Sequence, residues 1–102
     1  MKEWGMVEIR FNSLSEIHIY ATQSLDLSWL SKLLPTISIT ENNSAAAFGI
    51  FRYVIAGLKE MAKTATWAIL KQLISDGWEP VSRSDDYYAT YLLKKSHTNG
   101  SV

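Results

Sequence analysis

Residues 66–81 read TWAILKQLISDGWEPV, a helical pattern that ends at a glycine and leads past a tryptophan into a strand. We place Gly77 just past the helix, where a left-handed backbone favours a residue without Cβ. Trp78 then folds back on Leu73, the apolar contact that accompanies such a helix end. Pro80 cannot continue a helix and favours extended geometry in the residue before it. The predicted structural motif consists of Gly77, Trp78, Glu79 and Pro80.

The end of the chain resembles a known kind of domain. Residues 73–81 read LISDGWEPV, aromatic residues follow, and residues 91–95 give the basic end YLLKK. This pattern is similar to small bacterial domains of unknown function that end in a helix, a Gly-Trp-Glu turn and a strand hairpin. The resemblance covers the C-terminal third of the chain. It implies an α+β fold with an antiparallel sheet, and it carries over no activity and no catalytic residues.

Length and composition indicate a single domain. A chain of 102 residues buries roughly 60–70% of its unfolded surface in one core, which is sufficient for independent stability. We expect one α+β domain over residues 1–95. Residues 96–102 read SHTNGSV and are predicted to form a polar, disordered tail.

Several classes of protein are disfavoured by composition. The chain has no cysteine, so disulfides, thiol nucleophiles and thiolate metal sites are absent. Its ten basic and ten acidic residues cancel, which removes the positive field that favours nucleic-acid binding. The start lacks the apolar core of a secretion signal, and the apolar stretch 45–58 is interrupted by Arg52. We therefore expect a cytoplasmic protein that binds neither nucleic acid nor a membrane.

The N-terminal region predicts a strand hairpin. Apolar residues alternate with polar ones over 7–11 and again over 16–21, the period of half-buried strands. Both apolar sets must face the same side, so an odd number of residues must connect the strands. A loop over residues 12–16 satisfies this condition. It places Arg10 opposite His18 and Glu8 opposite Tyr20.

The remaining elements follow from spacing and end signals. Leucines at helical spacing predict a short helix over 26–34, with Ser24 or Asp26 as its cap and Pro35 as its stop. A strand is predicted over 36–40, and the main helix over 58–76. Strands over 81–83 and 87–94 complete the fold, joined through Ser84-Asp85-Asp86.

Residues 45–57 permit two interpretations. Phe48, Phe51 and Ile55 step by three and four into the following helix, which favours a helix. The stretch is also rich in aromatic and β-branched residues, which favour a strand, and Gly49 and Gly57 each cost roughly 1 kcal/mol inside a helix. The sequence leaves both interpretations open.

Candidate catalytic groups do not assemble into a site. His18 and His97 lie far apart, and neither has a second ligand at the spacing of a zinc site. The adjacent Asp85 and Asp86 fit a solvated turn better than a carboxylate pair. The serines occur in no Gly-x-Ser-x-Gly elbow, and the glycines form no phosphate-binding loop. We therefore assign no catalytic, cofactor or metal residues, and an enzyme is disfavoured.

We expect an α+β fold with an antiparallel sheet of about four to five strands, covered on one face by the main helix 58–76 and the short helix 26–34. The favoured function is a non-enzymatic interaction or regulatory module that binds a protein partner or itself. The alternative is a small-molecule-binding or catalytic domain with a pocket between helix and sheet, lined by Arg10, His18 and Tyr20. For the interaction module, the predicted interface lies in the apolar stretch after residue 45. It comprises Phe48, Ile50, Phe51 and Tyr53.

Overall fold

The computed structural model describes residues 2–13, 15–42, 49–84 and 90–98, with side chains for 5–11, 15–42, 49–81 and 91–95. Pairs of strands alternate with single helices along the chain. In order, they are β1 (Lys2–Ser13), β2 (Glu16–Ala21), α1 (Ser28–Leu33), β3 (Ser38–Asn42), β4 (Phe51–Ala56), α2 (Ala62–Ser75), β5 (Glu79–Ser84) and β6 (Thr90–Thr98).

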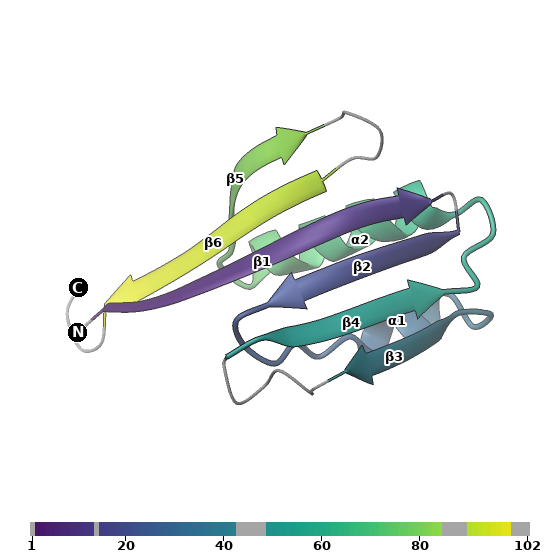
Figure 1. The fold of residues 1–102 in the computed structure, drawn as a ribbon, viewed down its shortest axis with the longest axis horizontal. Helices are drawn as coiled ribbons and strands as arrows, with labels where there is room; N and C mark the ends of the chain where they lie inside the picture. Colours follow the sequence, from purple (N-terminus) through teal and green to yellow (C-terminus); the bar gives the residue numbers. More distant parts are fainter. Residues whose placement is uncertain (1, 14, 43–48, 85–89, 99–102) are drawn as a thin grey trace.

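The described strands form one six-stranded antiparallel sheet in the order β3-β4-β2-β1-β6-β5. Each pair of consecutive strands is a hairpin, and the first hairpin lies in the middle of the sheet (Figure 1). The α+β class is confirmed. The sheet has more strands than the four to five expected, because part of the stretch 45–57, for which a helix was also possible, forms strand β4.

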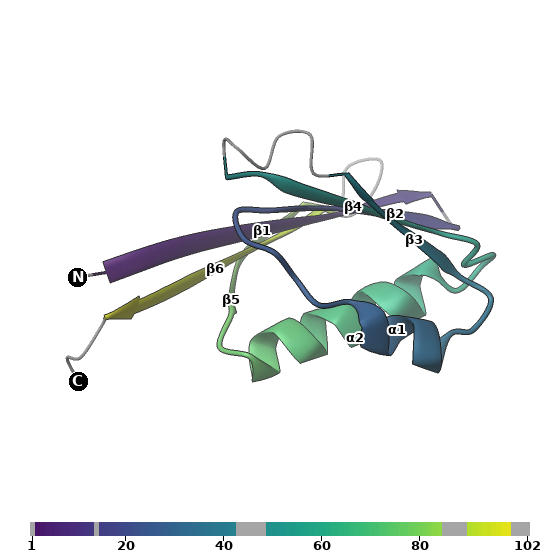
Figure 2. The ribbon, with the colours of Figure 1, turned by 90° about the horizontal axis from the view of Figure 1, so that it is seen from below.

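Both helices cover the same face of the sheet, as predicted (Figure 2). The core lies between them and the apolar residues of the central strands, among which Ile9, Ile19 and Ile55 are fully buried. From α2, the buried contacts come from Ala62, Ala65, Ile69, Leu70 and Leu73. The opposite face of the sheet carries no helix in the described part of the chain, and we call it the open face.

The corner after α2 has the predicted geometry. Gly77 has φ +99°, in the region that favours glycine. The Trp78 N–H donates to the Leu73 carbonyl at 2.9 Å, and the Gly77 N–H donates to the Ile74 carbonyl at 3.1 Å. This pair of bonds satisfies two carbonyls of the last turn. Trp78 is buried in the same core as Leu73, so the helix end also anchors β5 to the core.

The register predicted for the first hairpin is confirmed. Glu8 pairs with Tyr20 and Arg10 with His18. The strands extend further into the connection than expected, with a register shift between Phe11 and Ser13. That irregularity lets the strands continue while both apolar sets still face the core.

The structure resolves the ambiguity of 45–57 in favour of a strand over Phe51–Ala56. Residues 43–48 lie outside the described part of the chain. β4 pairs with both β2 and β3, and the buried Tyr53 and Ile55 alternate with Arg52 and Val54. This alternation is that of a strand with one face in the core. The apolar spacing of three and four residues that favoured a helix does not correspond to a helical face in the structure.

Helix α2 begins at Ala62 instead of residue 58. Gly57 has φ +78° and Lys59 has φ +57°, so the chain makes a turn before the helix starts. Leu58 is nevertheless buried, and its N–H donates to the Ser15 carbonyl at 3.2 Å. Leu58, whose apolar side chain fitted the helical pattern, therefore packs on the core from a turn that precedes the helix.

Other boundaries shift by a few residues. The helix expected over 26–34 covers Ser28–Leu33, and the strand expected over 36–40 covers Ser38–Asn42. β5 starts at Glu79 and includes Pro80, which an edge strand tolerates. β6 pairs with β1 as far as Thr98 opposite Lys2, so part of the expected tail is strand. The expected Asp85-Asp86 turn lies outside the described residues.

Candidate functional site

The residues predicted to line a pocket between helix and sheet lie elsewhere. Arg10, His18 and Tyr20 alternate with the buried Ile9, Ile17 and Ile19, so they lie on the open face, away from the helices. That placement corrects the predicted pocket. Alternation correctly separated polar from apolar side chains, but the helices cover the apolar face.

Tyr20 lies between two guanidinium groups on the open face. The Arg10 Cζ is 5.1 Å and the Arg52 Cζ is 5.5 Å from the centre of the Tyr20 ring, within cation–π range. Arg10 also forms an ion pair with Glu8, with 2.8 Å between Nε and Oε1. The hydrogen bond to Glu8, followed by the charge of Glu8, raises the pKa of the Arg10 guanidinium. This cation therefore already has a partner.

His18 is engaged at both ring nitrogens. Its Nδ1 lies 3.3 Å from Arg52 Nη2, and its Nε2 lies 2.5 Å from Glu16 Oε1. Because a guanidinium only donates, Nδ1 accepts, and neutral His18 carries its proton on Nε2 facing Glu16. His18 therefore has no free nitrogen to act as a base toward a substrate in this arrangement.

The predicted interface residues are also separated by the structure. Tyr53 is 2% exposed, and its hydroxyl accepts a 2.8 Å hydrogen bond from the Leu25 N–H, so it belongs to the core. Phe51 packs against the core, and only Ile50 is strongly exposed. Phe48 lies outside the described residues. The stretch therefore has one core face, which rules out Tyr53 as a contact residue.

An apolar groove lies instead between α2 and the β5–β6 hairpin. Trp67 is 62% exposed, and Ile74 and Val81 are each 49% exposed. The groove has a volume of about 500 Å³, and the buried Leu70 and Leu93 contribute to its lining. Exposed large apolar residues gathered at one place are typical of interaction surfaces. We call Trp67, Leu70, Ile74, Pro80 and Val81 the α2–β5 groove.

A basic residue lies on α2 beside this groove. Lys71 falls between Trp67 and Ile74 on the same stripe of α2, and its Nζ is 5.8 Å from the Trp67 ring centre. Between Ala62 and Ser75 the helix carries Lys63 and Lys71 and no acidic residue. The apolar surface therefore has a positive margin.

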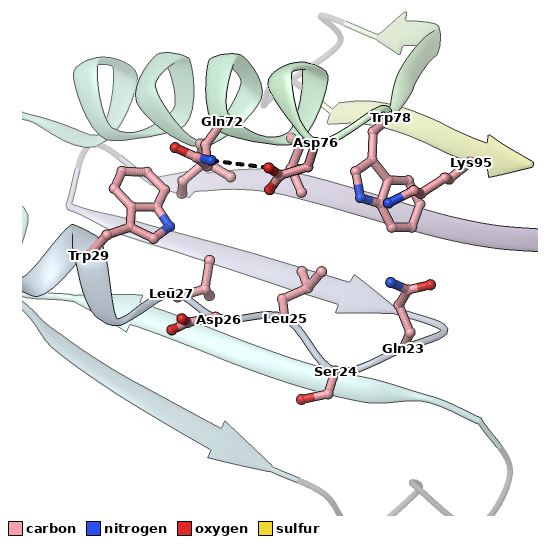
Figure 3. A pocket seen from close by; sticks show the side chains of 12 residues that line it. Gln23, Ser24, Leu25, Asp26, Leu27, Trp29, Gln72, Asp76, Trp78 and Lys95 are labelled. Carbon is pink, nitrogen blue, oxygen red and sulfur yellow. Dashed lines mark hydrogen bonds between the residues drawn. The ribbon is translucent and has the colours of Figure 1, made fainter. Parts of the chain in front are cut away.

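A second cavity, of about 350 Å³, lies at the C-terminal end of α2 (Figure 3). It is bounded by α1, by α2, by the segment after β2 and by Lys95 of β6. Leu27, Ile69, Leu73 and Trp78 are buried and form its apolar base. We call it the Trp78 cleft. It lies on the helix-covered side of the sheet, where the alternative function required a pocket.

The rim of the Trp78 cleft is polar. The Lys95 Nζ lies 5.7 Å from the Trp78 ring centre, and the Gln72 amide donates to Asp76 Oδ1 at 3.3 Å. Asp26 accepts hydrogen bonds from the Ser28 hydroxyl at 2.6 Å and the Ser28 N–H at 3.0 Å. The hydroxyl bond and then the backbone bond hold the pKa of Asp26 below its ordinary value. Gln23, Ser24 and Trp29 complete the rim.

Neither surface was predicted from sequence, although the apolar pattern of α2 contains a signal for the groove. Apolar residues occupy two faces of α2, one with Ile69 and Leu73 and a second with Trp67 and Ile74. A helix that packs on a core with one face needs only one apolar face. The Trp78 cleft combines segments remote in sequence, so no local motif indicates it. Among the described residues, no group of three or more His, Asp or Glu side chains is placed to hold a metal ion.

Neither described helix is long and apolar enough to cross a membrane. No protein-family model matches the chain, and no curated protein matches its sequence. The resemblance of the C-terminal third therefore stays a prediction, and the functional argument rests on the geometry of the two surfaces.

Proposed function

We propose that this domain is a protein-interaction module that binds a partner through the α2–β5 groove. The observation that carries the proposal is the exposed Trp67, which stands with Ile74 and Val81 around an apolar groove. Tryptophan is enriched among residues that dominate binding energy, because its large ring buries much area at little entropy cost. On the open face, in contrast, Arg10 is paired with Glu8, and Arg52 Nη2 donates to His18 Nδ1.

The charge of the groove specifies the partner's chemistry. Lys71 stands between the two exposed apolar residues of α2, and the helix has no acidic residue of its own. A partner segment with apolar side chains next to an Asp or Glu would fill the groove and pair with Lys71.

A second copy of the chain fits this surface less well. In a two-fold dimer, the same patch of both copies forms the interface. Lys71 lies at the margin of the patch, between Trp67 and Ile74 along α2, so such a dimer would bring two ammonium groups to one interface. Like charges at an interface oppose association, and a different protein is therefore the favoured partner.

Selection of a displayed peptide library on the full chain tests the proposal. We expect the selected peptides to share two apolar residues beside an acidic residue. Synthetic copies of these peptides should bind the Trp67→Ala domain at least about tenfold more weakly than the wild-type domain. The Lys71→Glu substitution is expected to weaken binding of the same peptides. Leu33→Ala is the matched control, because Leu33 is also an exposed large apolar residue but lies outside the groove.

Two results would overturn the proposal. Peptides that bind equally well to the wild type and the Trp67→Ala protein would place the interaction elsewhere. Concentration-dependent light scattering that shows a dimer dissolved by Trp67→Ala would establish self-association through the groove instead of a partner.

A further inference from the structure

We propose that the Trp78 cleft binds a small zwitterion with an apolar side chain, of which an aromatic α-amino acid is the simplest example. The cleft is separate from the α2–β5 groove, so this inference stands independently of the proposed interaction function. Its volume of about 350 Å³ is near the lower end of the roughly 300–1,000 Å³ of small-molecule pockets. A ligand of amino-acid size is therefore the appropriate scale.

Opposite charges line the cleft without pairing with each other. Asp76 ends α2 and Lys95 comes from β6, and both border the same cavity. Within the described residues, no ion pair joins Asp76 to Lys95. Asp76 has only the long hydrogen bond from Gln72, and Lys95 lies over the Trp78 ring. Both charges remain available to a ligand between them.

The two ends of the site favour different ligand groups. The Lys95 Nζ lies 5.7 Å from the centre of the Trp78 ring, and Figure 3 shows both side chains at the same end of the cavity. The Lys95 ammonium and the indole N–H are both donors, so this end suits a carboxylate. The other end has the Asp76 carboxylate and the C-terminus of α2, whose dipole attracts a positive charge. An ammonium group is therefore favoured there.

An apolar side chain has a matching surface on the far wall. Leu25, Leu27 and Trp29 line the cleft opposite Asp76 and Lys95 in Figure 3, and Leu27 is buried. Burial of an aromatic side chain there would supply most of the binding free energy, and the two charges would set its orientation.

A zwitterion fits better than a ligand with a single charge. A lone carboxylate would face Asp76 without compensation, and a lone amine would face Lys95. Asp26, the other acidic residue of the rim, is engaged by Ser28. A ligand that carries both charges matches Lys95 and Asp76 together, whereas a ligand with one charge leaves one of them unmatched and facing a like charge.

Nuclear magnetic resonance titration of the ¹⁵N-labelled full chain tests the inference. The probes are L-phenylalanine, 3-phenylpropionate, which lacks the ammonium, and 2-phenylethylamine, which lacks the carboxylate. We expect L-phenylalanine to shift the indole N–H signals of Trp29 and Trp78 and to bind about tenfold tighter than either analogue. Trp29→Phe removes the first of these indole signals and so assigns it, and Trp78→Phe does the same for the second.

Variants of the two charges give the decisive comparison. Lys95→Met and Asp76→Asn are each expected to remove the preference for L-phenylalanine over the analogues, while both keep the shape of the side chain. Lys94→Met is the matched control, because Lys94 is the neighbour on β6 and lies outside the cleft. Equal affinity for all three probes, no shift at either indole, or shifts centred on Trp67 would each overturn the inference.

Discussion

Gly5 of β1 lies directly against the ring of Trp78. A Cβ atom at residue 5 would stand 2.9 Å from the Cη2 of Trp78 and 3.2 Å from the Oε1 of Gln23. The first distance is too short for carbon atoms without movement of the ring. The absence of a side chain on β1 therefore lets the corner after α2 pack onto the opposite end of the chain.

Replacement of Gly5 by alanine is expected to lower the free energy of unfolding by about 1–3 kcal/mol, because the buried ring has little room to move. Among the described glycines, φ is positive at Gly49, Gly57 and Gly77 but not at Gly5, so backbone strain is not the cause at Gly5. Urea unfolding of Gly5→Ala in the wild-type and Trp78→Phe backgrounds measures the coupling. Equal costs in the two backgrounds would show that the ring contact is not responsible.

Replacement of Gly77 by valine is expected to destabilise the fold by about 1–3 kcal/mol, because a β-branched residue resists the φ of +99°. The nearest atom to an added Cβ is Lys95 Cε at 3.6 Å, an ordinary contact, so the cost comes from the backbone. Gly77→Asn is expected to cost less, since asparagine tolerates positive φ better. An unchanged urea midpoint for Gly77→Val would contradict this account.

The parts of the fold that sequence predicted are those set by local rules. The helix end at Gly77 depends on one residue's conformation, and the register of Arg10 with His18 depends on alternation and loop length. The β4 strand was ambiguous, because its core face is decided by pairing with β2 on one side and β3 on the other. Such long-range contacts override local periodicity.

The two candidate surfaces could not be predicted from the sequence for a similar physical reason. From the sequence, Trp67 is predicted to be a core residue, because apolar residues at helical spacing surround it. The structure leaves it exposed because Ile69 and Leu73 on another face of α2 are the ones that contact the sheet. The Trp78 cleft needs Asp26, Asp76 and Lys95 from three separate segments, and only the folded chain brings them together.

Asp26 is expected to stabilise the start of α1 in a pH-dependent manner. Its bonds from Ser28 lower its pKa in the folded protein below the ordinary value of 3.8. Because the folded pKa is the lower one, the stabilisation is complete above that ordinary value and is lost as pH falls through the folded pKa. Asp26→Ala should therefore reduce stability near neutral pH and reduce it less in acid, as measured by urea unfolding at several pH values. A cost that does not depend on pH would contradict this assignment.

Thr66 is buried in α2, and its hydroxyl oxygen has no hydrogen-bond partner among the described residues. A buried polar atom without a partner costs about 1–3 kcal/mol, so the nearly isosteric Thr66→Val should raise the free energy of unfolding by about 1 kcal/mol. Thr64→Val is the matched control, because Thr64 is exposed on the same helix and its replacement should change stability by less than about 0.5 kcal/mol. Both values come from urea unfolding monitored by circular dichroism. Loss of stability in Thr66→Val but not in Thr64→Val would show that the hydroxyl has a partner in solution, most simply a carbonyl of the preceding turn of α2.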